Sequence, residues 1–297
     1  MTGTASEHAE RFTVLRPLLF TIAYEILGSA TESDDVMQES YLRWAEVDLS
    51  TVADTKAFLA QLVTRQSLNA LRAQSRRREE YVGPWLPEPL LTQQDASADV
   101  VLAESVSMAM LVVLETLSPD ERAVFVLREV FGFAYEEIAS TIGKSTAAVR
   151  QMAHRARAHV QARRKRFDPV DPKVSTELTS RFFTAAATGD LDGLMAMLAP
   201  DVVWTADSDG KASAARRPVS GAERVARLIV GLVRFGGTDG RVEPAIYNSA
   251  PALVLYTGDH LEGVVSFEVV DGRITNFYAM RNPEKLSTVT VPRRIGR

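Results

Sequence analysis

The chain has 297 residues, of which 46% are hydrophobic and 24% are charged, and its formal net charge is −4. This length exceeds that of one typical domain, so we expect two or three domains. The absence of cysteine excludes disulfides, thiolate zinc sites and iron–sulfur clusters, and the four scattered histidines lead us to expect no metal and no cofactor. No apolar stretch is long enough for a membrane span or a signal peptide, as expected of a cytoplasmic protein.

Residues 7–79 have the apolar spacing of three helices, at about 7–27, 32–45 and 54–78. Gly28 suits the left-handed residue after a helix, and Thr31 with Asp34 predicts a capping box for the second helix. The third helix carries a basic cluster, which would attract phosphate or would equally suit a solvated helix end. The cluster consists of Arg65, Arg72, Arg76, Arg77 and Arg78.

Residues 81–91 (YVGPWLPEPLL) contain three prolines, which lack an amide donor and disfavour helix in the preceding residue. We therefore expect an extended linker that continues to about residue 100. Trp85 and Leu86 would be exposed to water on a free linker, so we expect them to dock on another part of the chain.

A second helical block covers about residues 99–166, and residues 135–158 (YEEIASTIGKSTAAVRQMAHRARA) have the pattern of a helix-turn-helix. Ala139 is small enough for close helix contact, Gly143 allows the turn, and Val149 would fill the interface. Ser145 is placed to cap the second helix. This segment is strongly basic although the net charge of the chain is negative, because residues 143–167 contain eight lysines or arginines and no acid.

At 100° per residue, the second helix of this motif has an apolar face and an opposite face that is small, polar and basic. The apolar face comprises Val149, Met152, Ala153, Ala156 and Val160. The opposite face fits the DNA major groove, although an ordinary helical hairpin with a basic solvent face is the alternative. The candidate DNA-binding residues are Thr146, Arg150, Gln151, His154, Arg155 and Arg157.

This motif and the preceding LSPDERAVFVLREVFG resemble region 4 of extracytoplasmic-function sigma factors, which binds the −35 promoter element. The segment DDVMQESYLRWAE is similar to the polymerase-binding part of sigma region 2, and the third helix is similar to its −10-binding part. The resemblance implies a non-enzymatic initiation factor whose partners are promoter DNA and the β and β′ subunits of RNA polymerase core. It implies polymerase contacts at Asp34, Asp35, Gln38 and Glu39, and −10 contacts at Gln61, Arg65, Asn69 and Arg72.

Helical spacing agrees with this assignment of the second helix. Val36, Ser40, Tyr41 and Trp44 would face inward, which leaves an acidic outer face with one exposed leucine, Leu42. Such a face suits a protein partner better than DNA.

After two Asp-Pro pairs near residue 170, the pattern changes to α+β. We expect helices at about 175–188, 191–198 and 221–233, and strands at 202–206, 252–257, 263–270 and 273–280. Asp271-Gly272 predicts a hairpin between the last two strands. The segments FFTAAATGDLDGLMAMLAPDVVWTADSDG and GRITNFYAMRNPEKL resemble the cone-shaped SnoaL-like fold, which is related to ketosteroid isomerases.

A sigma core followed by such a domain resembles a known subgroup, and this implies a junction through which the C-terminal domain regulates the factor. The implicated residues are Trp85, Leu86, Pro87, Glu88, Pro89, Asp239, Gly240, Arg241, Asn282 and Pro283. The expected architecture is multidomain, with two all-α DNA-binding domains, a linker and a C-terminal α+β domain. The expected divisions are 1–80, 81–100, 101–167 and 168–297.

Two alternatives stay open. The cone could hold a pocket for a small ligand or for catalysis, because a buried Asp beside aromatic rings would have a raised pKa and could act as a base. Its candidate residues are Trp204, Asp207, Asp209, Tyr256 and His260. Residues 207–210 equally fit a turn, however, and a fold alone implies no function. The chain could also be a helix-turn-helix activator that does not bind polymerase.

Overall fold

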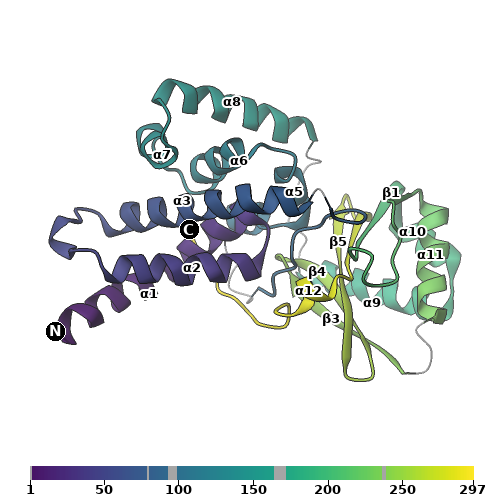
Figure 1. Cartoon of the computed structure of the whole chain (residues 1–297). Coiled ribbons are helices and arrows are strands. Elements are labelled where there is room, and N and C mark those ends of the chain that lie inside the picture. The colour runs from purple at the N-terminus through teal and green to yellow at the C-terminus, as the bar shows by residue number, and fades with distance from the viewer. Residues whose placement is uncertain (1, 79, 93–98, 164–171, 236–238) are drawn as a thin grey trace.

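The computed structural model describes residues 2–78, 80–92, 99–163, 172–235 and 239–297, which form two helical units and one α+β unit (Figure 1). The first unit comprises α1 (Thr2–Leu27), α2 (Ala30–Ala45), the 3₁₀ turn η1 (Leu49–Thr51) and α3 (Thr55–Arg78). The second unit comprises α4 (Val100–Ser105), α5 (Met108–Leu114), α6 (Pro119–Phe125), the π-helical turn η3 (Val126–Val130), α7 (Tyr135–Ile142) and α8 (Thr146–Arg163).

The turn between α1 and α2 forms at Gly28, whose φ of 68° is the left-handed conformation expected after a helix. Helix α2 begins earlier than predicted, because the hydroxyl of Ser29 accepts a hydrogen bond from the backbone nitrogen of Glu32 at 3.0 Å. Ser29 is therefore the N-cap, and the capping box predicted at Thr31 and Asp34 is wrong.

The two helical units share one hydrophobic core. Leu19 of α1, Val63 of α3, Leu127 of η3 and Val149 of α8 are buried in the same cluster. Helix α3 packs against both α6 and α7. Since these apolar surfaces are removed from water against one another, the two helical units form one packed body in this structure.

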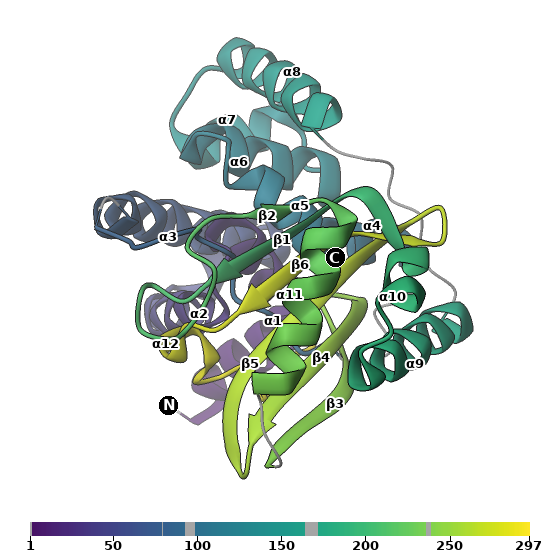
Figure 2. The same cartoon turned by 90° about the vertical axis from the view of Figure 1, so that its right-hand side faces the viewer.

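The third unit is built on a six-stranded sheet in the order β2-β1-β6-β5-β4-β3, antiparallel except for the β1–β6 pair. Three helices cover one face of the sheet (Figure 2). They are α9 (Pro172–Thr188), α10 (Leu191–Met197) and α11 (Ala222–Phe235). The strands are β1 (Leu198–Asp207), β2 (Val219–Ser220), β3 (Gly240–Tyr247), β4 (Ala250–Thr257), β5 (His260–Val270) and β6 (Arg273–Met280), and the short helix α12 (Pro283–Leu286) follows.

The hairpin predicted at Asp271-Gly272 is present, with Val270 paired to Arg273. The sequence prediction missed β3 and the turn that follows it at Asn248, whose φ is 53°. Pro244 disfavoured a strand prediction here, because proline has no N–H to donate to a neighbouring strand. It is tolerated in β3 because β3 is an edge strand.

The two faces of the sheet have different partners. The helix-covered face is filled by aromatic rings of Phe182, Trp204, Phe267 and Phe277, with centroids 5.2–6.1 Å apart. Residues of the other face pack with Leu86 of the linker and with α5. The linker therefore lies between the sheet and the helical units. Within the described ranges, no helix has the length and apolarity needed to cross a membrane.

Candidate functional site

Helices α7 and α8 meet at the turn expected from the sequence. Gly143 has a φ of 69°, and the backbone nitrogen of Lys144 donates to the carbonyl oxygen of Ala139 at 3.1 Å. The hydroxyl of Ser145 accepts a backbone N–H in the first turn of α8 at 3.2 Å. Val149 is fully buried, as predicted for the interface residue. The remaining members of the predicted apolar face are also buried, namely Met152, Ala153, Ala156 and Val160.

The opposite face of α8 is directed away from the core. Gln151 and His154 are exposed, and Thr146 is half-buried. The three arginines pair with acids of the same unit, and the hydrogen bond with Glu129 raises the pKa of the Arg157 guanidinium. The pairs are Arg150–Glu136 at 3.1 Å, Arg155–Glu121 at 3.2 Å and Arg157–Glu129 at 2.6 Å. The Arg150–Glu136 pair is exposed on both sides, and such pairs contribute little to stability.

Parts of the two basic clusters lie outside the described residues. These are Arg164, Lys165 and Arg166 after α8, and the side chains of Arg76, Arg77 and Arg78 at the end of α3.

The candidate −10 residues of α3 lie against the helix-turn-helix. The guanidinium of Arg65 donates to the carbonyl oxygens of Ser140 and Thr141, both at 2.9 Å. Gln61 donates to the hydroxyl of Ser140 at 3.2 Å. These carbonyls belong to the last turn of α7, where a cation is favoured by the helix dipole. The −10 candidates of the first unit and the helix-turn-helix therefore contact each other directly.

An ion-pair cluster extends the same contact. Asp120 of α6 pairs with Arg72 at 2.8 Å and with Lys144 at 3.2 Å. Burial opposes ionisation of Asp120, but the hydrogen bonds from Arg72 and Lys144 outweigh it and hold its pKa below the usual value. Asn69 is exposed beside this contact. Three of the four −10 candidates thus bind residues of the second unit.

The candidate polymerase-binding residues lie on the outer face of α2. Asp35, Gln38 and Glu39 are exposed, and Asp34 is half-buried. Leu42 is 56% exposed, as predicted. The residues predicted to face inward do so, with Val36, Ser40 and Trp44 buried and Tyr41 half-buried.

The C-terminal segment after α12 returns to the first unit, which the sequence did not indicate. Arg293 pairs with Asp34 at 2.7 Å, and its backbone nitrogen donates to the carbonyl of Leu91 at 3.0 Å. The backbone nitrogen of Gly296 donates to the hydroxyl of Thr21 at 3.0 Å. This segment therefore joins the α+β unit to α1, α2 and the linker.

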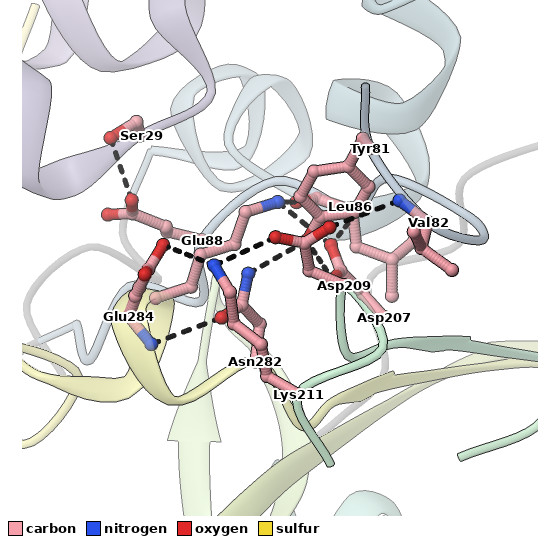
Figure 3. A network of polar contacts seen from close by, with 11 residues as sticks. Ser29, Tyr81, Val82, Leu86, Glu88, Asp207, Asp209, Lys211, Asn282 and Glu284 are labelled. Atoms are coloured by element: carbon pink, nitrogen blue, oxygen red, sulfur yellow. Dashed lines mark hydrogen bonds and ion pairs between the residues drawn. The ribbon is translucent and has the colours of Figure 1, made fainter. Parts of the chain in front are cut away.

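The linker is fixed to the α+β unit by a buried ion pair (Figure 3). Asp207 pairs with Lys285 at 2.8 Å, with side chains 0% and 7% exposed respectively. Asp207 also accepts from the backbone nitrogen of Leu86 at 2.7 Å, and Lys285 donates to the carbonyl of Leu86 at 2.7 Å. The hydroxyl of Tyr81 donates to the other carboxylate oxygen of Asp207. Leu86 is thus held through both its backbone N–H and its carbonyl oxygen.

Trp85 docks as predicted, because the ammonium of Lys285 lies 3.3 Å from the centroid of its ring. The Tyr81 ring packs against Trp85 with centroids 4.6 Å apart. Burial lowers the pKa of Lys285, and the charge of Asp207 opposes this shift. Asn282 also belongs to the junction, since its amide donates to the hydroxyl of Tyr81 at 2.9 Å.

The linker is fixed to the first unit through Glu88. Its carboxylate accepts from the hydroxyl of Ser29 at 2.8 Å and from the backbone nitrogen of Thr31 at 2.9 Å, at the start of α2. The hydroxyl of Tyr24 donates to the carbonyl of Glu88 at 2.7 Å. Pro87 and Pro89 are buried on either side, so all of residues 85–89 take part in the junction.

Asn248 connects all three units and was missed from the sequence. Its amide nitrogen donates to the hydroxyl of Tyr24 and to the carbonyl of Val106, at 2.7 and 2.8 Å. Its amide oxygen accepts from the backbone nitrogen of Leu90 at 2.9 Å. The only signal in the sequence was an Asn-Ser pair between apolar residues, which is typical of a tight turn.

Asp239, Gly240 and Arg241 do not lie at this junction, contrary to the prediction. They occupy the start of β3, whereas the turn that contacts the helical units follows its last residue, Tyr247. Arg241 instead stacks over the ring of Tyr256 at 4.2 Å. An eight-residue strand separates its two ends by roughly 23 Å. Pro283, the first residue of α12, is exposed, and its part in the junction stays a prediction.

The five residues considered for a ligand or catalytic pocket do not share one cavity. Trp204 is buried in the aromatic core, Asp207 is bound at the junction, and His260 is exposed. Asp209 pairs with Lys211 at 2.8 Å, a contact that lowers its pKa. Tyr256 lies under Arg241. The carboxyl that would have served as a base is therefore occupied by the linker.

Three family models match successive parts of the chain. Residues 12–77 match sigma-70 region 2, residues 107–160 match sigma-70 region 4, and residues 179–277 match the SnoaL-like domain. The order and the ranges agree with the three units of the structure.

Two relatives match this chain over most of their length. The chain is 39% identical over 291 residues to the ECF RNA polymerase sigma factor SigJ of Mycobacterium tuberculosis, covering 93% of this chain and 92% of SigJ. It is 30% identical to a probable ECF RNA polymerase sigma factor of the same species, SigI, over 91% of this chain and 92% of SigI. The crystal structure of M. tuberculosis SigJ superposes with a TM-score of 0.75 at 35% identity, covering 95% of this chain and 99% of that one. The chain belongs to the extracytoplasmic-function sigma factors of RNA polymerase, with a SnoaL-like domain after regions 2 and 4.

Proposed function

We propose that the chain binds RNA polymerase core and directs it to promoters, with α8 at the −35 element and α3 at the −10 element. The exposed basic face of α8 supports the first assignment, because such a face fits the major groove. The arginines Arg65 and Arg72 of α3 support the second, because a groove for single-stranded DNA is basic. The cytoplasm is the place of action that this function requires.

The proposed polymerase contact is the outer face of α2, against the β and β′ subunits. Asp35, Gln38 and Glu39 are exposed there, and the pattern of carboxylates around exposed Leu42 suits a protein surface. Asp34 is the fourth candidate, although its carboxylate already pairs with Arg293.

The SnoaL-like domain is proposed to regulate this activity by holding the free chain closed. The observation that carries this proposal is the contact of Arg65 with the carbonyls of Ser140 and Thr141, which covers the −10 candidates. Helix α3 must separate from α7 before α3 and α8 can bind their two promoter elements at the same time. The junction at Asp207, Lys285 and Asn248 opposes that separation, since it ties both helical units to the same sheet.

Run-off transcription with purified polymerase core tests the proposal. Wild-type chain should yield transcripts from templates that it selects, and Asp35→Lys should abolish them while DNA binding through α8 is retained. A matched reversal at an exposed acid of the far domain, Glu223→Lys on α11, should leave transcription unchanged. Absence of transcripts from the wild type despite DNA binding would instead identify an activator that does not bind core.

A further inference from the structure

A cleft of about 680 Å³ opens between the first unit and the SnoaL-like domain. One wall is formed by α2 and α3, including Asp35 and Glu39. The other wall is formed by the linker ring of Trp85 and by residues of the SnoaL-like domain, including Asp209 and Glu284. The cleft therefore belongs to two domains at once, and its shape depends on the junction.

The lining of the cleft is acidic. Among the residues that the structure describes, the lining has six carboxylates and one cation, Lys285, whose charge is matched by buried Asp207. Lys211 pairs with both Asp209 and Glu284 at 2.8 Å, and Arg43 pairs with Glu39 at 2.9 Å. Even with these two cations counted, carboxylates are in excess among the described side chains of the cleft. A cleft lined by one sign of charge attracts a partner segment of the opposite sign.

The cleft is also continuous with the proposed polymerase contact, because Asp35 and Glu39 belong to both. A partner that docks on the outer face of α2 therefore meets Glu284, whose side chain is 72% exposed, on the opposite wall. The rings of Tyr81 and Trp85, which also line the cleft, offer apolar area for the stems of long basic side chains.

We propose that the SnoaL-like domain forms part of the docking surface for polymerase, and that a basic segment of the core enters this cleft and contacts Glu284. This inference rests on the proposed function, since it extends the polymerase contact from α2 to the second wall. The domain then has two effects: it holds the free chain closed, and it adds a wall to the surface on which the core binds.

Equilibrium binding of the full chain to purified polymerase core, at two salt concentrations, tests the inference. Glu284→Lys should weaken binding roughly fivefold and reduce its salt dependence, because it replaces attraction by repulsion. Glu284→Gln should weaken binding about twofold and guards against misfolding of the reversed variant. The matched control is Glu223→Lys, an exposed first-turn glutamate that is also ion-paired and lies on α11, away from α2 (Figure 1).

The outcomes separate the two proposals. Equal affinities for Glu284→Lys and Glu223→Lys, together with a loss of binding for Asp35→Lys, overturn the composite surface and leave the α2 contact intact. No effect of Asp35→Lys overturns both. If sedimentation shows that Glu284→Lys dissociates a dimer of the free chain, the cleft is a self-association surface and the proposal is wrong.

Discussion

The amide of Asn248 donates to the hydroxyl of Tyr24 at 2.7 Å, which joins residues 224 positions apart. Both side chains are fully buried. Burial raises the pKa of the Tyr24 hydroxyl, so it stays protonated and donates onward to Glu88. One side chain of the SnoaL-like domain therefore fixes the position of α1 relative to the linker.

Replacing Asn248 should destabilise the whole chain. Asn248→Gly keeps the left-handed turn but leaves three buried polar groups without their partner, and the expected loss in the free energy of unfolding is about 2–4 kcal/mol. Urea denaturation measures this loss. Asp271→Gly, at another left-handed hairpin position with exposed surroundings, is the control and should change stability by less than about 1 kcal/mol. A similar small loss for both variants would contradict the bridging role.

Breaking the buried ion pair should have a larger effect than breaking an exposed one. Lys285→Met leaves the charge of Asp207 buried without a counter-ion, which costs about 3–5 kcal/mol. Lys211→Met removes the exposed partner of Asp209 and should cost at most about 1 kcal/mol. The double variant Asp207→Asn/Lys285→Met should recover stability relative to Lys285→Met. Equal losses for the two lysine variants would show that Asp207 does not need Lys285 as a counter-ion.

The free energy of unfolding should fall as the pH rises towards the raised pKa of Glu25. Burial raises the pKa of this carboxyl from 4.5 to about 8, against the hydrogen bond from Ser105 and the charge of Arg122. The pKa of Glu25 is higher in the folded chain than in the unfolded chain. The contribution of the neutral carboxyl to stability is therefore complete below about pH 4.5, and it is lost as the pH approaches 8. The slope is about 1.4 kcal/mol per pH unit in this window. Urea denaturation between pH 5.5 and 8 should show this decline in the wild type and not in Glu25→Gln. Parallel profiles would mean that Glu25 does not titrate in this range.

Weakening the contact between α3 and the second unit should make Arg72 and Lys144 available to bind DNA. Asp120→Asn removes the partner of Arg72 and Lys144, so affinity for a DNA oligonucleotide at low salt should rise roughly threefold. Fluorescence anisotropy measures the affinity, and hydrogen exchange of the α3 amides reports the opening. Glu7→Gln makes the same charge change at an exposed pair on α1 and is the control. An equal rise for both variants would indicate a net-charge effect without opening.

The local chemistry of the DNA-binding helices was predictable from the sequence. Gly143 and Ser145 set the turn and the cap of α8, and the 3.6-residue period placed Val149 and Val160 inside and Gln151 outside. The same reasoning found the hairpin at Asp271-Gly272 and the docking of Trp85, because an aromatic ring on a proline-rich linker needs an apolar surface. Each of these predictions used only neighbours within a few residues, and the partner on which Trp85 docks, Lys285, was not among them.

The closed arrangement was not predictable, because it depends on which surfaces meet across long distances in the chain. Nothing around Arg65 indicates that its partners are the carbonyls of Ser140 and Thr141. The sequence around Asp207 fits a catalytic base or a turn, and neither predicts its ion pair with Lys285. The implication that Asp239–Arg241 lie at the junction failed for the same reason, since strand direction places them at the far end of β3.

The sequence by itself determined the three units, their order and the basic face that fits DNA, because helix period, turn residues and local charge are short-range properties. Only the tertiary structure decided that these units close on one another. Burial of Asn248, Asp207 and Lys285 between domains makes their polar groups satisfy one another, and no local pattern specifies which partners they find.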